Sequence, residues 1–439
     1  MRMQRFSPGR RLVALAGVAA LAATMIGCGA SDEEGGGRVT IRMGYYAEAG
    51  GPADKTMRSL ADEFMKANSG IKLELESAPY TDFFKRLRTQ LAGGKGPDVW
   101  LSDGVLVQEY AGRNSLRDLS DFVKTVNTDD YYGVDLNRDS DGHIYGFPQG
   151  AQTPVLFYNK KMFADAGVAE PTGDWTYDDL TAAAKKLTRD TNGDGKPDVW
   201  GMRVYSPGFT ESWWPMVKAF GGDVVADGGR KVVVDSPQSR AALDWMLNAM
   251  YTEKAGPDVV TTKALGSPHT MFASNRVAMQ FGIYARTIPA NAAKIDLGVA
   301  PMPKGPAGRG HVAIANSWVI NKAANQRKAE AAWKWITYFA SEKPQTTWAG
   351  IGEAIPINKK VAASDVFLKP GTPPADRQAF LDALADADDL GLNPVWTEYT
   401  TAVANQVDRA LAKERPVGDA LTEAQRDAQQ IIDRFYAKK

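Results

Sequence analysis

The segment from residue 190 to residue 198 has the residue types and the spacing that bind a hard cation. Oxygen-bearing side chains stand at relative positions 1, 3, 5 and 9, and a glycine at position 6 permits the tight turn that points them inward. Position 12, where a complete calcium loop has a bidentate glutamate, is Gly201. We predict a structural calcium ion here, and the alternative is an Asx-rich turn that needs no metal. The predicted ligands are Asp190, Asn192, Asp194, Lys196 through its carbonyl, and Asp198.

A shorter form of the same pattern occurs in residues 137–144. Asn137, Asp139 and Asp141 precede Gly142, but the chain then continues directly into Tyr145 without further oxygen ligands. A metal site and a polar turn both remain as interpretations of this segment.

Catalytic patterns are poorly represented in this chain. The histidines, His143, His269 and His311, are far apart, and no G-x-S-x-G nucleophile motif occurs. Counting carboxylates does not exclude a glycosidase pair, so an exported carbohydrate-active enzyme stays as an alternative. The sequence favours a protein that is not an enzyme and that requires no cofactor.

The single cysteine, Cys28, follows a basic head and an apolar run of 15 residues that ends at Ile26. Such a run extends only about 22 Å as a helix, which is shorter than the roughly 30 Å of a bilayer core. The pattern predicts a lipoprotein signal over residues 1–27 that is removed, with Cys28 lipidated. Residues 28–38 are glycine-rich and polar and predict a flexible linker. We therefore expect a protein anchored on the extracytoplasmic face of the cell membrane through lipid alone.

Composition limits the partners. The chain has 52 Lys and Arg against 52 Asp and Glu, so it lacks the basic surface of a nucleic-acid-binding protein. One cysteine allows no disulfide within the chain. The 11 tryptophans exceed what packing alone usually requires, and we expect some of them to stack on a ligand.

The order of the expected elements indicates an α/β fold. A strand at 39–45, a helix with apolar residues at helical spacing over 57–65, and an alternating strand from Ile71 open the fold. A helix that Thr81 can cap and a strand at 98–101 follow. This order predicts a mainly parallel sheet with helices on both faces. Further expected elements are strands at 155–158, 278–283 and 312–320, helices at 176–187, 213–220 and 326–339, and helical structure from 374, ending at 420–436.

Strands and helices alternate in the same way in both halves of the chain, and no repeat of fixed period occurs. This pattern predicts two α/β lobes that share chain segments. We place residues 39–150 and about 308–346 in lobe 1, and residues 151–307 and about 347–439 in lobe 2. Trp333 and Trp335 lie inside a helical stripe and are expected in a core. Other aromatic residues lie at strand ends or helix starts, where α/β folds bind ligands: Tyr45, Tyr46, Trp213, Trp214, Tyr284 and Trp396.

Several segments together resemble the extracellular solute-binding proteins of bacterial ABC importers, especially the maltodextrin-type branch. The strongest is residues 156–167, LFYNKKMFADAG, which is followed by Pro171 and by Trp175 to Leu180. The segments 145–148, 96–100, 327–339 and 406–415 also match, so the resemblance covers essentially the whole chain after the signal.

The resemblance implies a bilobal, type II periplasmic-binding-protein fold with a hinge and a ligand cleft between the lobes. It also implies a sugar or short oligosaccharide ligand and its delivery to the permease of an ABC importer. We expect the protein to be a monomer. A glycerophosphodiester or a peptide is the alternative ligand. By position in the family, Gln152 replaces a sugar-binding carboxylate and Tyr284 replaces a stacking tryptophan. The expected ligand contacts are Tyr45, Glu48, Asp103, Gln152, Trp213, Trp214, Tyr284, Asn316 and Trp396.

Overall fold

The computed structural model describes residues 37–206, 211–266, 268–388 and 390–438. The expected signal, Cys28 and nearly all of the linker lie outside these ranges. The strands are β1 (Val39–Tyr46), β2 (Ile71–Ala78), β3 (Val99–Ser102), β4 (Phe147–Gln152), β5 (Val155–Asn159), β6 (Trp200–Met202), β7 (Val225–Ala226), β8 (Lys231–Val232), β9 (Val277–Gly282), β10 (Leu297–Ala300), β11 (Ile314–Ile320) and β12 (Ile355–Pro356).

Lobe 1 is built on a mixed sheet. Among the described residues, six strands form it in the order β12-β4-β11-β3-β1-β2. β1 pairs in parallel with both β2 and β3, whereas β11 runs antiparallel to β3 and to β4. The expected, mainly parallel sheet is therefore correct only for β1, β2 and β3. The other strands enter the sheet without a strand–helix–strand crossover from a neighbour, so nothing imposes the parallel direction on them.

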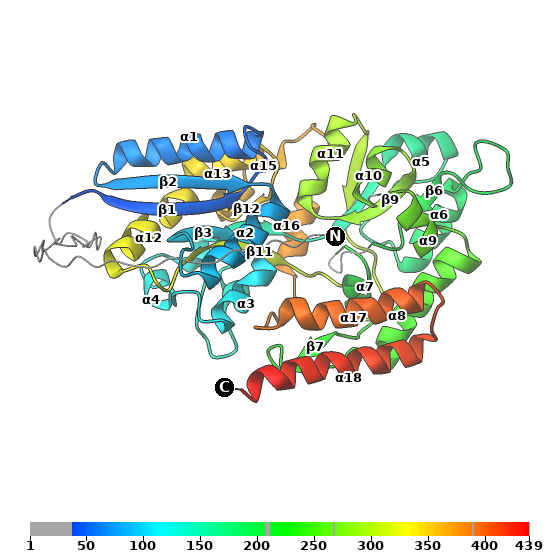
Figure 1. The fold of residues 1–439 in the computed structure, drawn as a ribbon. Helices are drawn as coiled ribbons and strands as arrows, with labels where there is room; N and C mark the ends of the chain where they lie inside the picture. Colours follow the sequence, from blue (N-terminus) through cyan, green and yellow to red (C-terminus); the bar gives the residue numbers. More distant parts are fainter. Residues whose placement is uncertain (1–36, 207–210, 267, 389, 439) are drawn as a thin grey trace, which may run out of the picture. The chain divides into compact units, whose positions relative to one another are not determined.

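Lobe 2 is built on a second sheet, in which four described strands have the order β10-β5-β9-β6. β5 is antiparallel to β9 and β10, and β6 is parallel to β9. β7 and β8 form a separate short hairpin. Figure 1 shows β1 and β2 of the first sheet at one side of the view and β6 and β9 of the second at the other.

The α-helices cover these sheets. They are α1 (Pro52–Ala67), α2 (Tyr80–Ala92), α3 (Val107–Gly112), α4 (Ser120–Val123), α5 (Lys160–Ala166), α6 (Tyr177–Leu187), α7 (Trp213–Ala219), α8 (Pro237–Leu247), α9 (Val259–Ala264), α10 (Pro268–Ala273), α11 (Thr287–Ala292), α12 (Gln326–Ala340), α13 (Glu342–Ala349), α14 (Lys359–Ala362), α15 (Asp365–Leu368), α16 (Gln378–Ala385), α17 (Trp396–Leu411) and α18 (Val417–Tyr436). Short helical turns are η1 (Gly104–Leu106), η2 (Thr128–Asp130), η3 (Asp135–Asn137), η4 (Asn248–Thr252) and η5 (Tyr284–Arg286). No helix within the described ranges is both long and apolar enough to cross a membrane.

The pleat of β3 separates two hydrophobic clusters. Trp100 packs with Phe83 and Tyr110 of α2 and α3, whereas its neighbour Leu101 belongs to the cluster that contains Phe64 and Trp335 of α1 and α12. Successive side chains of a strand point to opposite faces, so both faces of this sheet are covered. The expectation of a sheet with helices on both faces is confirmed for lobe 1.

The expected core tryptophans of α12 are confirmed, because Trp333 is 7% exposed and Trp335 is 0% exposed. The expected cap at Thr81 is wrong. α2 begins at Tyr80 after Pro79, whose carbonyl accepts from the Phe83 amide at 2.8 Å. The proline presets the backbone for the first turn, and the helix starts without a side-chain cap.

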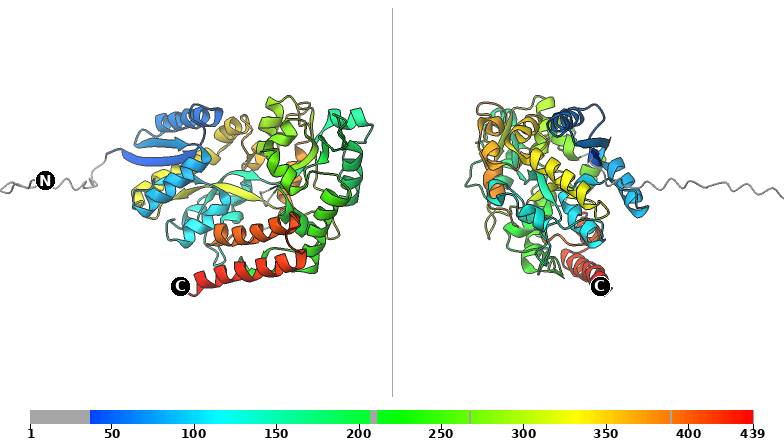
Figure 2. Two further views of the ribbon diagram at one scale, coloured as in Figure 1. Left: turned by 45° about the vertical axis from the view of Figure 1, so that its right-hand side comes forward. Right: turned by 90° about the vertical axis from the view of Figure 1, so that its left-hand side faces the viewer.

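We expected the chain to pass from lobe 1 to lobe 2 near residue 346, which is too early. β12 pairs with β4, with Ile355 opposite Ala151, so the chain is still in the first sheet at Pro356. The sequence could not show this, because a strand of two residues has no detectable period. At the C-terminus, α17 and α18 lie side by side (Figures 1 and 2) and their buried residues join the core of lobe 2.

Candidate functional site

A hollow of about 280 Å³ opens on lobe 1 where β1 ends and where α1 and α2 begin. The segments that meet there are far apart in sequence, since β4, β11, α13 and the loop before β12 complete the wall. The lining residues are Tyr46, Ala47, Glu48, Gly51, Pro52, Ala53, Tyr80, Leu101, Gln149, Asn316, Trp348, Glu353 and Ala354. We call this site the lobe 1 hollow.

Two side chains in the wall have buried polar atoms without a protein partner. Gln149 is 2% exposed, and its Nε2 has no hydrogen-bond partner among the residues that the structure describes. Trp348 is 6% exposed, and its indole Nε1 is likewise buried without a hydrogen-bond partner among the described residues. Leaving such donors unpaired costs free energy, so a ligand that accepts hydrogen bonds would be favoured here.

Asn316 is held in place by a close approach of two backbones. The Gly104 amide donates to Asn316 Oδ1 at 3.1 Å, which leaves the Nδ2 group as a donor at the hollow. A Cβ at Gly104 would lie 2.6 Å from the Ala315 carbonyl oxygen, so only glycine allows this approach. Glu48 also lines the hollow, so two of the residues expected to contact a ligand, Glu48 and Asn316, lie there.

Aromatic rings form one side of the hollow. Tyr46 and Tyr80 meet edge to face with centroids 5.3 Å apart, and Phe84 packs on both rings from α2. Tyr80 is 48% exposed, which leaves its ring accessible to a ligand. Such faces suit the C–H surfaces of sugars, whose hydroxyls then reach the polar wall.

Asp103 fixes the orientation of Tyr80 and does not itself line the hollow. The Tyr80 hydroxyl donates to Asp103 Oδ2 at 2.6 Å, and the Val105 amide donates to Oδ1 at 3.2 Å. Burial raises the pKa of the Asp103 carboxyl, although these two donors act in the opposite direction. In this structure Asp103 orients Tyr80, and a direct contact of Asp103 with a ligand stays a prediction.

Gln152 does not line the hollow either. Its Nε2 donates to the backbone oxygen of Glu353 at 2.8 Å, and its Oε1 is buried without a partner. The side chain therefore positions the Glu353 backbone. A role of Gln152 in ligand binding stays a prediction.

The expected contact through Tyr45 is wrong, because this ring lies in the core of lobe 1. Tyr45 is 1% exposed and its hydroxyl donates to Asp54 Oδ1 at 2.6 Å. The alternation of β1 turns the next residue, Tyr46, to the hollow. The sequence placed an aromatic residue at this strand end correctly but assigned it to the wrong face.

The expected stacking tryptophans form a buried ladder in lobe 2. Trp213 stacks on Trp214 with centroids 5.7 Å apart, and Trp214 stacks on Trp396 at 5.4 Å. They are 3%, 0% and 2% exposed, so their faces are used by one another in this structure. Their contact with a ligand stays a prediction.

Tyr284 is also buried, at 3% exposure. Its ring packs against Phe367 and Phe380 at 5.0 and 5.3 Å, and the Arg377 guanidinium lies 6.0 Å from its centroid. The stacking surface predicted for Tyr284 is therefore covered by α15 and α16 in this structure.

The predicted calcium segment forms a turn closed by its own amides. Asp190 Oδ1 accepts from the Gly193 amide at 2.7 Å and Oδ2 accepts from the Gly195 amide at 2.7 Å, while Asp198 Oδ2 accepts from the Thr191 hydroxyl. Oxygen donors of this kind suit a hard cation. In the described part of the chain, no group of three Asp, Glu, His or Cys side chains is arranged to hold a metal.

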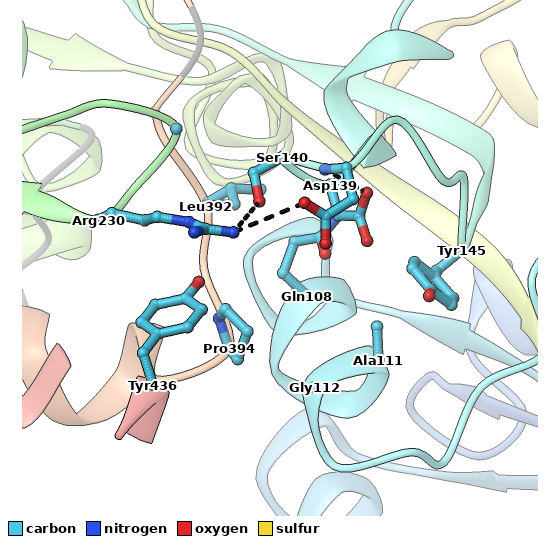
Figure 3. A pocket seen from close by; sticks show the side chains of 12 residues that line it. Gln108, Ala111, Gly112, Asp139, Ser140, Tyr145, Arg230, Leu392, Pro394 and Tyr436 are labelled. Atoms are coloured by element: carbon cyan, nitrogen blue, oxygen red, sulfur yellow. Dashed lines mark hydrogen bonds and ion pairs between the residues drawn. The ribbon is translucent and has the colours of Figure 1, made fainter. Parts of the chain in front are cut away.

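The shorter segment, 137–144, forms a polar turn that meets the other lobe. Asp139 Oδ1 accepts from the amides of Asp141 and His143. Arg230, from the loop between β7 and β8, donates to Ser140 Oγ at 3.1 Å and lies 3.6 Å from an Asp141 oxygen (Figure 3). In this turn the nearest cation is thus a guanidinium.

Among the polar and aromatic residues that line the hollow, the sequence analysis did not assign Tyr80, Gln149, Trp348 and Glu353 to a site. Tyr80 could have been found from the sequence, because it lies two residues after the end of β2. Trp348 and Glu353 could not, because β12 brings them to the hollow by a pairing that local pattern does not reveal.

The fold and a ligand-sized hollow between strand ends define a two-lobed binding protein. Residues 49–346, more than half of the chain, match the family described as bacterial extracellular solute-binding protein. The chain belongs to this family. The expected fold class is confirmed, and the family consists of binding proteins that act outside the cytoplasm.

Curated relatives and solved structures agree with this assignment. The diacetylchitobiose-binding protein DasA of Streptomyces coelicolor is 27% identical over 407 residues, which cover 88% of this chain and 90% of the relative. A maltooligosaccharide ABC transporter solute-binding lipoprotein of Streptococcus pneumoniae is 25% identical, covering 70% of this chain and 71% of the relative. The structure of a Listeria monocytogenes ABC substrate-binding protein in complex with cycloalternan superposes with a TM-score of 0.78 at 23% identity, covering 90% of this chain and 99% of that chain.

Proposed function

We propose that this protein is the substrate-binding component of an ABC importer and captures a sugar or a short oligosaccharide. The observation that carries the proposal is the lobe 1 hollow, where unpaired donors and acceptors stand beside aromatic rings. Gln149, Trp348 and Asn316 offer donors, and Glu48 and Glu353 offer acceptors. A hydroxyl both donates and accepts, so a polyhydroxylated ligand matches both kinds of group.

Relatives support the same class of ligand. Their names refer to diacetylchitobiose and to maltooligosaccharides, and a similar structure is bound to cycloalternan. We propose that the lobes close around the ligand and that the closed form delivers it to the permease. Contacts between the lobes, such as the Thr397 hydroxyl with Glu109 Oε2 at 2.5 Å, would favour the closed form.

A thermal-shift screen of mono- and oligosaccharides tests the proposal. A sugar at 100 times its Kd is expected to stabilise the protein by about 2.7 kcal/mol. The variant Gln149→Leu is expected to bind the identified sugar at least tenfold more weakly, because a buried donor is lost. Stabilisation by peptides or glycerophosphodiesters, and by no sugar, would contradict the proposal.

We also propose that Cys28 carries a lipid anchor on the outer face of the cell membrane. The support is the signal pattern in the sequence and the lipoprotein named among the relatives. Metabolic labelling with a fatty acid, followed by membrane fractionation, tests this proposal. Unlabelled protein in the soluble fraction would contradict it.

A structural calcium ion at the 190–198 segment is a further proposal, supported by the spacing of its oxygen ligands. Calcium is expected to raise the melting temperature by several degrees, because it binds the folded loop only. Asp190→Ala is expected to abolish this response, while Asp121→Ala, at an exposed position of α4, retains it. An equal melting temperature with calcium and with chelator would leave the segment as an Asx-rich turn.

A further inference from the structure

The lobe 1 hollow has an unbalanced charge. Its charged lining residues, Glu48 and Glu353, are both acidic. Asp103 adds a third carboxylate behind Tyr80. Burial raises the pKa of Tyr46, and the negative charges of Asp103 and Glu353 raise it further. No lysine or arginine is among the residues that line the hollow.

Of the two carboxylates that line the hollow, Glu353 is the more buried. Its side chain is half-buried and has no hydrogen bond or ion pair among the contacts of the described residues. Burial raises the pKa of the Glu353 carboxyl, with no neighbouring charge acting in either direction. Acidic side chains that lose solvent are normally paired, so an unpaired one at a ligand site indicates that the ligand provides the partner.

The surroundings of Glu353 suit an ammonium group. Tyr46, Tyr80 and Trp348 line the same hollow, and a cation placed over an aromatic face is attracted by the ring. The positive charge of Arg88, on α2, opposes the rise that burial causes in the pKa of Tyr80, but Arg88 does not line the hollow. A ligand amine would therefore meet carboxylate and aromatic groups without a competing protein cation.

We propose that the ligand of the lobe 1 hollow is a sugar that carries a protonated amine, and that Glu353 is the residue that selects it. This inference rests on the proposed function and narrows its class of ligand. A neutral sugar can donate hydroxyl hydrogen bonds to the Glu353 carboxylate, whereas a protonated amine also neutralises its charge. An acidic sugar or a phosphate ester would add repulsion.

Matched sugars that differ only in the substituent at C2 of each ring test this proposal. Calorimetric titration of the full chain would compare the β-1,4-linked disaccharide of glucosamine with its N-acetylated form and with cellobiose, and glucosamine and galactosamine with glucose and galactose. At pH 7 the amine-bearing member of a set is expected to bind at least tenfold more tightly. Its affinity is expected to fall as the pH decreases through the raised pKa of Glu353, because protonation removes the charge that the amine requires.

The variant Glu353→Gln keeps the size of the side chain and removes its charge. It is expected to lose the preference for the amine, so that matched sugars bind with similar affinity. Glu342→Gln, on the exposed surface of α13 where Glu342 pairs with Lys360, is the control and is expected to keep the preference. A melting curve of each variant confirms that it is folded.

The outcomes separate this inference from the proposed function. Neutral sugars that bind as tightly as the amine-bearing ones would overturn the inference and leave the proposed function intact. An amine preference that survives in Glu353→Gln would overturn the role of Glu353. Binding of no sugar of either kind would overturn both.

Discussion

Replacement of Trp396 by alanine is expected to lower the free energy of unfolding by about 3–5 kcal/mol, because truncation of a buried tryptophan removes its contacts and leaves a cavity. Trp396 is 2% exposed and stacks on Trp214 with an angle of 21° between the rings. On its other side, Tyr399 meets it edge to face at 5.4 Å. Denaturant unfolding followed by circular dichroism measures the loss.

Trp245→Ala on α8 is the matched control, because this tryptophan is only half-buried. Its truncation is expected to cost clearly less stability. Equal losses in the two variants would show that the tryptophan ladder contributes nothing beyond ordinary packing. Ligand affinity is measured on Trp396→Leu, which fills part of the space but has no aromatic ring; unchanged affinity there would remove Trp396 from the predicted ligand contacts.

Replacement of Glu211 by alanine is expected to have a similar cost, about 3–5 kcal/mol, because it leaves buried positive charge without its partner. Glu211 is 5% exposed, and its Oε1 accepts from Arg286 Nε at 3.0 Å and from the Ile283 amide at 3.3 Å. Arg203, itself 2% exposed, lies 3.8 Å from the second carboxylate oxygen. The decrease in denaturation midpoint measures the effect.

The control for Glu211 is an exposed ion pair. Asp121 pairs with Lys124 at 2.7 Å, and their side chains are 94% and 74% exposed. Asp121→Ala is expected to change the free energy of unfolding by less than about 0.5 kcal/mol, because solvent screens exposed pairs. A Glu211 variant as stable as this control would show that the arginines are solvated or paired elsewhere.

Local pattern was sufficient for most of the secondary structure. The apolar stripe predicted over 326–339 is α12, and the helix predicted over 176–187 is α6, which the Thr176 side chain caps. These elements could be predicted because the period of burial is written in neighbouring residues. The direction of β11 could not, since it depends on where the chain comes from when it returns to the first sheet.

The candidate site was only partly predictable. Strand ends indicated where a ligand would be expected, and Glu48 and Asn316 line the hollow there. Tyr45 and Tyr46 were both candidates at this strand end and only Tyr45 was kept as a ligand contact, whereas Tyr46 lines the hollow, because neighbouring residues of a strand face opposite sides. Trp348 and Glu353 reach the hollow only through the pairing of β12 with β4.

The sequence by itself determined the α/β character and the family, because both follow from short-range order. The tertiary structure alone decided which aromatic rings face a ligand and which face one another. Exposure depends on contacts between distant segments, as in the ladder of Trp213, Trp214 and Trp396. The same long-range contacts place Glu353, which has no side-chain partner in the described part of the chain, in one hollow with Tyr46 and Trp348, and no local pattern could indicate this.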